Sequence, residues 1–289
     1  MSVYRTEGGR RQLLQLYEDT LARIPAEVER RHIPTEFGMT HVLVAGPKHG
    51  PPVVVHQGGN FPSPVTLLWF SALFRRFRVY APDLPGSPGY SEPEHLATRP
   101  GGLERWPLQV LDGLGIDRAP HMGASYGAGV ILAAAVEAEG RISRMVLLMP
   151  AGIARPPLWT LMRELAFPML RYRLCPTSEN LRAAVRSLHT DPPDDLLLRV
   201  HAAIFQHLRL VRTMAAPRDP AALARARIPA LVVAGERDPL FPADALVRRL
   251  PHVLPGARTL MLKGTRHFPS AEDREEISRA ILDFASSPG

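Results

Sequence analysis

The chain has 289 residues, of which 45% are hydrophobic, so it can bury a sizeable core as one large domain or as two ordinary ones. No apolar run reaches the about 18 residues that a membrane helix needs, and the N-terminal sequence lacks the apolar core of a signal peptide, which predicts a cytoplasmic protein without membrane insertion. The formal net charge is +7, but no basic run is interleaved with aromatic residues, which excludes a nucleic-acid-binding face.

The first predicted element is an amphipathic helix in the N-terminal segment, residues 1–30. In the stretch RRQLLQLYEDTLARI the apolar side chains recur with helical period and share one face: Leu13, Leu14, Tyr17, Leu21 and Ile24. We expect this face to pack against the rest of the chain or against a second copy in a homodimer.

Eight short runs are then predicted to be strands. RHIPT and MTHVLVAG flank a turn at Phe37 and Gly38 and indicate a hairpin. Six apolar runs follow, each ending in turn residues: VVVHQGGN, FRVYAPDLPG, HMGAS, RMVLLMPAG, ALVVAGERD and TLMLKGTRH. Apolar strands separated by helical stretches are typical of a parallel sheet covered on both faces. We therefore predict an α/β fold with a mostly parallel eight-stranded sheet flanked by helices, formed by residues 31–152 and 227–289.

Residues 153–226 interrupt this alternation with a helical segment punctuated by prolines. An interruption of this length cannot be a bare loop, so we predict an inserted helical cap over the strand ends. Ligands of open α/β sheets bind outside the carboxyl ends of the strands, where such a cap would shape a pocket. The apolar cap residues predict either an apolar pocket or only the packing of the cap itself. The predicted pocket residues are Asn60, Phe61, Trp159, Met162 and Phe268.

The stretch GASYGAG contains the pattern G-x-S-x-G at Gly123, Ser125 and Gly127, between a predicted strand and a predicted helix. The pattern alone is weak, but a nucleophile elbow requires this strand-to-helix context to hold its serine in an unfavourable backbone conformation. Other strands end in a glycine pair, in Asp238 and in His267. In the order glycine-rich loop, elbow, cap, acid and histidine, the chain resembles the α/β-hydrolase family over nearly its whole length.

The resemblance implies a catalytic triad of Ser125, His267 and Asp238. Histidine is the side chain whose ordinary pKa suits it to accept the serine proton, and the acid would orient the imidazole. Glu236 competes with Asp238, because the chain turns at GERDP and strand parity cannot choose between two residues that are two positions apart. The resemblance favours Asp238. The family usually has glycine before the histidine, where this chain has Arg266, so the geometry of that loop is left open.

The resemblance also implies two backbone N–H donors for the oxyanion, one from Tyr126 and one from the glycine-rich loop. At this loop the usual sequence of the family is histidine, glycine and then the donor residue, whereas residues 56–60 of this chain read His-Gln-Gly-Gly-Asn. If Gln57 takes the position of the histidine, Gly59 donates, and a register one residue earlier makes Gly58 the donor. We favour Gly59, because that register keeps a glycine directly before the donor.

Together these features predict a serine hydrolase of the carboxylesterase type, which attacks a small-molecule substrate through Ser125 and releases the acyl group with water. The apolar cap indicates an ester, lactone or thioester with a hydrophobic part. Cys175 is the only cysteine, which excludes a disulfide and a cysteine-based metal site, and we expect no metal and no cofactor. Two alternatives stay open: a carbon–carbon bond hydrolase or lyase-like enzyme on the same triad, and a hydrolase-like receptor or scaffold with little turnover.

Overall fold

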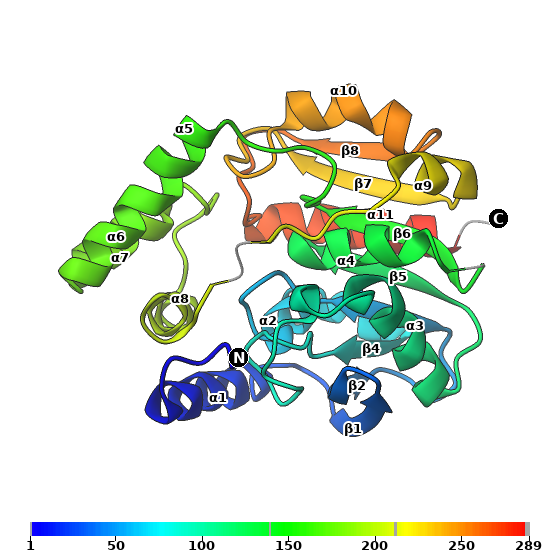
Figure 1. Cartoon of the computed structure of the whole chain (residues 1–289), viewed down its shortest axis with the longest axis horizontal. Coiled ribbons are helices and arrows are strands. Elements are labelled where there is room, and N and C mark those ends of the chain that lie inside the picture. Colours follow the sequence, from blue (N-terminus) through cyan, green and yellow to red (C-terminus); the bar gives the residue numbers. More distant parts are fainter. Residues whose placement is uncertain (1, 139, 211–212, 287–289) are drawn as a thin grey trace.

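A single twisted sheet of eight strands forms the centre of the computed structural model, which describes residues 2–138, 140–210 and 213–286 (Figure 1). The strands lie in the order β1-β2-β4-β3-β5-β6-β7-β8, with β2 antiparallel to both of its neighbours and β3 to β8 parallel to one another. The strands are β1 (Val28–Thr35), β2 (Gly38–Ala45), β3 (Pro52–His56), β4 (Arg78–Pro82), β5 (Ala119–Ala124), β6 (Ile142–Leu148), β7 (Ala230–Gly235) and β8 (Arg258–Leu262). The predicted fold class is confirmed.

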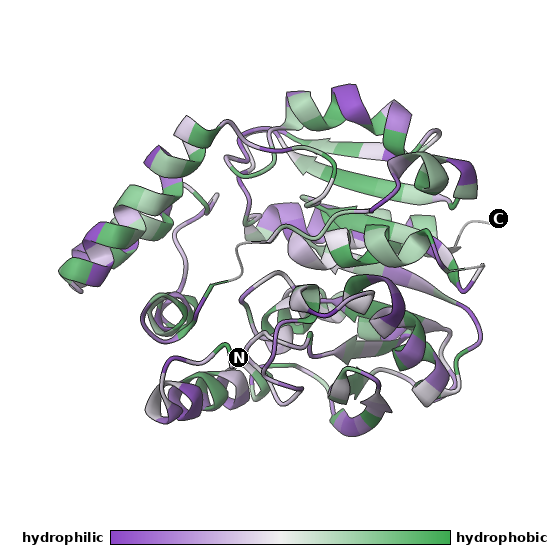
Figure 2. Cartoon of the chain, in the orientation of Figure 1, coloured by the Kyte–Doolittle hydropathy of each residue, from purple (hydrophilic) through white to green (hydrophobic). Residues whose placement is uncertain are grey.

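The central strands are apolar because both faces of the sheet are covered. Successive side chains of a strand point to opposite faces, and in β6 Val146 and Leu148 join one hydrophobic cluster while Met145 and Leu147 join another. Figure 2 shows β7 as almost uniformly hydrophobic, whereas the covering helix α10 carries residues of both kinds. Apolar residues at every position of a strand therefore indicate two covered faces, as the sequence predicts.

Eleven α-helices accompany the sheet in the described residues. Helices α2 and α11 cover one face with a 3-10 segment (Ser71–Arg75), and α3, α4, α9 and α10 cover the other. The helices of the core are α2 (Ser63–Trp69), α3 (Gly102–Leu114), α4 (Tyr126–Ala135), α9 (Pro220–Ala226), α10 (Ala243–Val253) and α11 (Ala271–Ser286). None of the helices in the described part of the chain is long and apolar enough to cross a membrane.

The predicted N-terminal helix is α1 (Glu7–Leu21), which begins three residues before the predicted stretch. It starts there because the Thr6 hydroxyl accepts a hydrogen bond from the Gly9 N–H, at 3.1 Å, and so caps the first turn. Its buried face includes Leu13 and Tyr17, and α1 packs against α2 and against α8 (Asp195–His207) of the cap. The predicted apolar stripe thus packs within the chain.

The cap helices follow β6 and lie at one end of the sheet, with α1 beside them (Figure 1). A continuous helical arm comes first: α5 (Leu158–Leu161), one π-helical turn (Met162–Ala166) and α6 (Phe167–Leu174). Helix α7 (Ser178–Arg186) and α8 complete the cap. The chain re-enters the sheet through α9 and β7, so these helices form one insertion between β6 and β7.

Two fully buried histidines lie side by side beneath the glycine-rich loop. His56 Nε2 and His121 Nδ1 are 3.0 Å apart, on the neighbouring strands β3 and β5. Burial lowers the pKa of His56 to about 3. Burial, helped by the neighbouring His56, lowers the pKa of His121 well below its ordinary value. Both rings are therefore neutral in the folded protein at neutral and mildly acid pH.

Because these two histidines are buried in the neutral form, we expect the folded protein to lose stability in mild acid. A folded-state pKa below the unfolded value of about 6.5 means that the unfolded chain binds more protons as the pH falls, so stability is complete above about pH 6.5 and is lost toward pH 3. His56 alone should lower the free energy of unfolding by about 2 kcal/mol at pH 5. Urea unfolding at pH 7.5 and pH 5 measures this loss. His252→Gln, which removes an exposed histidine of α10, should leave the loss unchanged, and a pH-independent free energy would contradict the prediction.

Candidate active site

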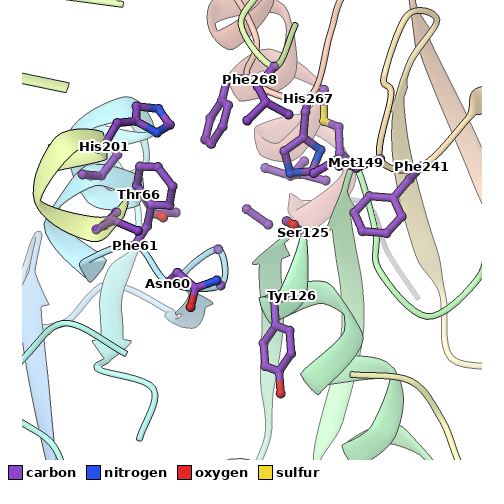
Figure 3. A pocket seen from close by; sticks show the side chains of 18 of the residues that line it. Asn60, Phe61, Thr66, Ser125, Tyr126, Met149, His201, Phe241, His267 and Phe268 are labelled. Atoms are coloured by element: carbon purple, nitrogen blue, oxygen red, sulfur yellow. The ribbon is translucent and has the colours of Figure 1, made fainter. Parts of the chain in front are cut away.

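Ser125 lies on a sharp turn between β5 and α4, as the elbow prediction requires. Its backbone has φ 52° and ψ −114°, a conformation that costs a non-glycine residue free energy and persists only where the surroundings impose it. The Ser125 N–H donates to Leu148 O at 2.8 Å, and Ser125 O accepts from Ala151 N–H at 3.1 Å, so β6 and the loop after it hold the turn. Figure 3 shows the Ser125 side chain facing a pocket beneath the His267 ring.

The glycines around Ser125 are required by close backbone approach. A Cβ on Gly123 would lie 2.6 Å from the Ala128 nitrogen of α4, and a Cβ on Gly127 would lie 2.5 Å from the Gln57 carbonyl oxygen. Real Cβ atoms do not approach other atoms so closely. The two glycines of the G-x-S-x-G pattern therefore allow strand, helix and glycine-rich loop to meet at the serine.

His267 follows β8 and contacts the carboxylate of Asp238, which follows β7. His267 Nδ1 lies 2.9 Å from Asp238 Oδ2, and both side chains are almost completely buried. The other oxygen, Asp238 Oδ1, accepts hydrogen bonds from the N–H groups of Leu240 and Phe241, at 2.8 and 3.1 Å. These donors fix the carboxylate, and the carboxylate in turn fixes the imidazole.

Glu236, the competing acid, points elsewhere. Its carboxylate is exposed and accepts a hydrogen bond from the Gly264 N–H at 2.8 Å, so it ties the loop after β7 to the loop after β8. The chain turns directly after β7, where Asp238 N–H donates to Gly235 O at 3.1 Å, and this turn aims the two carboxylates in different directions. The structure thus brings Asp238, and not Glu236, to His267.

The glycine-rich loop packs directly against the start of α4. A Cβ on Gly59 would lie 2.8 Å from the Tyr126 Cβ, whereas a Cβ on Gly58 would have its nearest neighbour, Ala124 O, at 3.9 Å. Tyr126 is the first residue of α4, where an N–H has no acceptor within the helix and the helix dipole is positive. Burial raises the pKa of the Tyr126 phenol to about 12, and Figure 3 shows its side chain pointing away from the pocket. Its backbone is therefore the part that faces the site.

Gln57 braces the glycine-rich loop, a role that the sequence alone did not reveal. Its side-chain amide donates to Phe61 O at 2.7 Å, and its side-chain oxygen accepts from Leu84 N–H at 3.2 Å. The loop is thereby closed on itself and tied to the segment after β4. The sequence implicates Gln57 only in the register of the loop, because a lone glutamine gives no signal of its partners.

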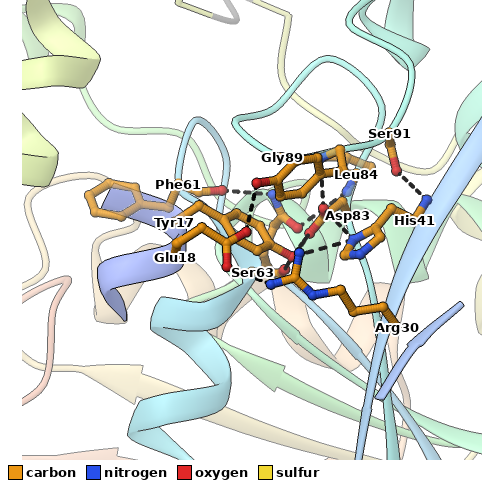
Figure 4. Close-up of polar contacts among 12 residues, drawn as sticks. Tyr17, Glu18, Arg30, His41, Phe61, Ser63, Asp83, Leu84, Gly89 and Ser91 are labelled. Carbon is orange, nitrogen blue, oxygen red and sulfur yellow. Dashed lines mark hydrogen bonds and ion pairs between the residues drawn. The ribbon is translucent and has the colours of Figure 1, made fainter. Parts of the chain in front are cut away.

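A buried polar cluster around Asp83 holds the far end of the same loop (Figure 4). Asp83 accepts hydrogen bonds from the Tyr17 hydroxyl at 3.1 Å, from the Tyr90 N–H at 2.9 Å and from the Ser63 hydroxyl, and it lies 2.9 Å from His41 Nδ1. The cluster joins α1, β2 and the start of α2. We assign Asp83 a bracing role, and it lies outside the pocket that Ser125 faces.

Ser125, Tyr126 and His267 line one cavity of about 220 Å³ between the sheet and the cap. Three of the predicted pocket residues, Asn60, Phe61 and Phe268, line it as well. Most of the remaining lining is apolar and comes from the cap, from α2, from the segment directly after β6 and from the loop after β7: Trp69, Met149, Leu165, Met169, Ile204, Phe205, Leu210, Met214 and Phe241. The serine hydroxyl thus opens into a predominantly apolar space.

The prediction that Trp159 and Met162 line this pocket is wrong. Trp159 is 68% exposed, and neither residue belongs to the cavity lining. The arm that carries them has two apolar faces, and its inner face is formed by Leu165 and Met169. Sequence periodicity shows that a helix has an apolar face but not which of two such faces is turned inward.

An aromatic wall connects the cap to the His267 loop, and two of its members, His189 and His201, were not predicted from the sequence. Phe268 stacks on His189, with ring centroids 4.4 Å apart, and packs against Phe61 at 5.2 Å. His189 Nε2 lies 2.8 Å from His201 Nε2, and His201 of α8 lines the cavity. Burial lowers the pKa of His189 to about 3 and that of His201 well below its usual value, so this pair is neutral and serves as part of the wall.

Backbone hydrogen bonds join the same two segments. Phe268 N–H donates to Leu188 O at 2.8 Å, and Thr190 N–H donates to Phe268 O at 3.0 Å, as in a short parallel bridge. The Thr190 hydroxyl accepts from Arg266 N–H at 2.9 Å. Arg266, where the family usually has glycine, also donates from its side chain to Ser187 O at 3.0 Å. The histidine loop is therefore held by the cap as well as by β8.

Comparison with known proteins agrees with this architecture. Carboxylesterase YbfK of Bacillus subtilis is 25% identical over 98% of this chain and 96% of its own length. The 2-hydroxymuconate semialdehyde hydrolase of Pseudomonas putida is 35% identical, but over only 37% of this chain and 38% of its own length. Among solved structures, naproxen esterase (carboxylesterase NP) of Bacillus subtilis superposes with a TM-score of 0.83 at 22% identity and covers 97% of this chain and 99% of its own, a likeness that shows the fold.

The family model for the alpha/beta hydrolase family matches residues 49–280 of the chain. That range runs from β3 into α11 and includes the glycine-rich loop, the elbow at Ser125, the cap, Asp238 and His267. With the sheet order and the elbow geometry already described, this match shows that the chain belongs to the alpha/beta hydrolase family.

Proposed function

We propose that this protein is a serine hydrolase of the carboxylesterase type, which cleaves an ester with a hydrophobic part through an acyl-enzyme on Ser125. One observation carries the proposal: the strained Ser125 shares an apolar cavity with His267, whose Nδ1 lies 2.9 Å from the buried Asp238 carboxylate. A nucleophile, a base and an orienting acid in this arrangement are what acyl transfer through a serine requires.

In this mechanism Asp238 Oδ2 accepts the Nδ1 proton of His267, which leaves Nε2 to take the proton of the Ser125 hydroxyl. The serine oxygen attacks the acyl carbon, and His267 then donates the proton to the departing alcohol. Water, deprotonated by the same imidazole, releases the acid and restores the hydroxyl. Asp238 stays ionised throughout and stabilises the imidazolium that forms in each step.

The negative charge of each tetrahedral intermediate would be met by two backbone N–H groups. Tyr126 offers one from the first position of α4, and Gly59 offers the second from the adjoining loop. The close packing of Gly59 on Tyr126 supports this pair, since it brings the glycine-rich loop next to the first residue of α4. Gln57 and the Asp83 cluster serve as positioning groups, because they hold the loop that presents Gly59.

The cavity supports an ester whose acyl or alcohol part is apolar and of short to medium length. Its volume of about 220 Å³ is below the roughly 300–1,000 Å³ of sites for drug-sized ligands. The full-length similarity to carboxylesterase YbfK supports the same class of substrate.

A fluorophosphonate should label Ser125 selectively, because this serine combines a strained elbow, a base and neighbouring N–H donors. Mass mapping of the adduct tests the assignment, with Ser125→Ala as the unlabelled control. An adduct on another serine would remove Ser125 as the nucleophile.

The unlabelled wild-type protein should hydrolyse p-nitrophenyl esters of short and medium chain length for hundreds of cycles without a partner. Rates with lactones and thioesters then define the preference for the type of bond. Release of only about one product molecule per protein molecule would instead identify a receptor-like protein with little turnover. Cleavage of a carbon–carbon bond without any ester hydrolysis would favour the alternative of a carbon–carbon bond hydrolase or lyase-like enzyme.

A further inference from the structure

The cap carries an unusual concentration of exposed apolar side chains on the α5–α6 arm, residues 158–174, which we call the cap arm. Leu158, Trp159 and Leu174 are 73%, 68% and 78% exposed, and Phe167 and Leu170 are each 52% exposed. These five are half of the ten large hydrophobic residues that are exposed in the described part of the chain. Single exposed apolar residues are normal, but a cluster of this kind marks an interaction surface.

The helical geometry gathers four of these side chains on one face. Residues 162–166 form a π-helical turn, which holds more residues than an α-helical turn. Trp159 and Phe167 are eight residues apart, against about seven for two α-helical turns, so the wider turn returns them to the same side. Leu170 and Leu174 follow Phe167 at spacings of three and seven, which continue that face along α6.

The opposite face of the cap arm closes the cavity of Ser125. Leu165 and Met169 belong to the cavity lining, whereas Phe167 and Leu170, between and beside them, are exposed. The arm is therefore a single helical layer between the cavity and the surroundings. An apolar molecule held on the outer face would be separated from the cavity by this one helical layer.

The surroundings of this face are strongly basic. Residues 155–186 contain six arginines against two glutamates, and all six arginines are exposed: Arg155, Arg163, Arg171, Arg173, Arg182 and Arg186. Figure 2 shows this mixture of hydrophobic and hydrophilic residues along the arm. Tryptophan, phenylalanine and leucine on a face flanked by arginines are the composition of helices that lie in the surface of anionic lipids.

We propose that the cap arm docks on an anionic lipid surface and inserts its apolar face there. Charge decides against a second copy of the chain as the occupant, because two such faces would bring two clusters of arginines together. Docking would place the cavity beside the layer in which hydrophobic esters dissolve. This last step rests on the proposed esterase function, whereas docking itself does not.

The test uses the full-length Ser125→Ala protein, so that binding is measured without hydrolysis. Vesicles of phosphatidylglycerol should co-sediment with the protein and shift the emission of the exposed Trp159 to shorter wavelength, and phosphatidylcholine vesicles should bind at least tenfold more weakly. High salt should weaken the binding to phosphatidylglycerol, since the attraction of arginines to anionic headgroups is screened.

Variants of the cap arm distinguish specific docking through this surface from non-specific adsorption to vesicles. Phe167→Ser with Leu174→Ser should weaken vesicle binding at least tenfold, while Met39→Ser with Val247→Ser, which alters exposed apolar residues elsewhere, should leave it unchanged. Arg171→Gln and Arg182→Gln should each weaken binding about fivefold, whereas Arg249→Gln on α10 should have little effect. In an otherwise wild-type protein, none of these variants should change the hydrolysis of a short, water-soluble ester.

Several results would overturn the proposal: no vesicle binding, equal binding to both lipids, or equal losses from the arm and control variants. A concentration-dependent dimer that Phe167→Ser with Leu174→Ser abolishes would replace the lipid surface by a second copy. If the Ser125→Ala protein binds vesicles as expected but the wild-type protein hydrolyses no ester, then the proposed function fails and the docking surface stands.

Discussion

Replacing Ser125 with alanine should lower kcat/KM for a p-nitrophenyl ester by several orders of magnitude, and His267→Ala should cost about as much. Neither residue has a catalytic role without the other, because the serine needs a base and the base needs a proton to remove. The double variant should therefore be little worse than either single one. Steady-state rates of the three variants, measured with the wild-type protein, test this non-additivity.

His252→Ala is the matched control, since it removes an exposed histidine of α10 without touching the cavity. It should retain the wild-type rate. Losses that multiply in the double variant would mean that Ser125 and His267 act in separate steps or separate sites, and the triad would then be wrong.

Asp238→Asn should lower activity by about three to four orders of magnitude in a folded protein. The asparagine keeps the shape of the turn and an oxygen for the N–H groups of Leu240 and Phe241, but its amide can present N–H to His267 and favour the wrong tautomer. Glu236→Gln should cost about tenfold or less, because Glu236 is exposed and a glutamine oxygen can still accept from the Gly264 N–H.

These two variants form a matched pair, since each replaces one carboxylate of the same turn by its amide. Rates are compared after circular dichroism has shown that both variants are folded. A severe loss in Glu236→Gln together with a retained rate in Asp238→Asn would transfer the orienting role to Glu236.

The fold could be predicted because its signals are redundant along the chain. Each central strand is apolar at successive positions, as Met145 to Leu148 illustrate, and a strand buried on both faces allows little else. The motifs add a second constraint, since Ser125, Asp238 and His267 each follow a strand and parallel strands end at one edge. Neither of these two signals depends on the detailed conformation of a loop.

The parts of the site that depend on the conformation of a loop could not be predicted from the sequence. Strand parity cannot separate Asp238 from Glu236, although the resemblance favours Asp238. The structure separates them, because Asp238 Oδ2 lies 2.9 Å from His267 Nδ1 whereas the Glu236 carboxylate accepts from the Gly264 N–H. The bracing role of Gln57 is not predictable for the same reason, because its partners Phe61 and Leu84 are brought to it by the tertiary structure.

The sequence also could not show which side of the cap helices faces the pocket. The sequence assigns Trp159 to the pocket because the apolar residues of the cap indicate an apolar pocket, whereas Trp159 lies on the exposed face of an arm that is apolar on both sides. The contribution of α8, through His201, has no signature in the sequence, since a lone histidine in a helix is compatible with many surroundings.

The bridge between residues 188–190 and the His267 loop has a consequence for protein engineering. A cap exchanged with that of a relative at the boundaries 153 and 226 would remove the carbonyl of Leu188 and both donor and acceptor groups of Thr190, which hold Phe268 and Arg266 in place. A chimera would then lose the placement of the base together with the old specificity. Grafts that aim to change only the substrate should therefore replace the α5–α6 arm and leave residues 187–190 native.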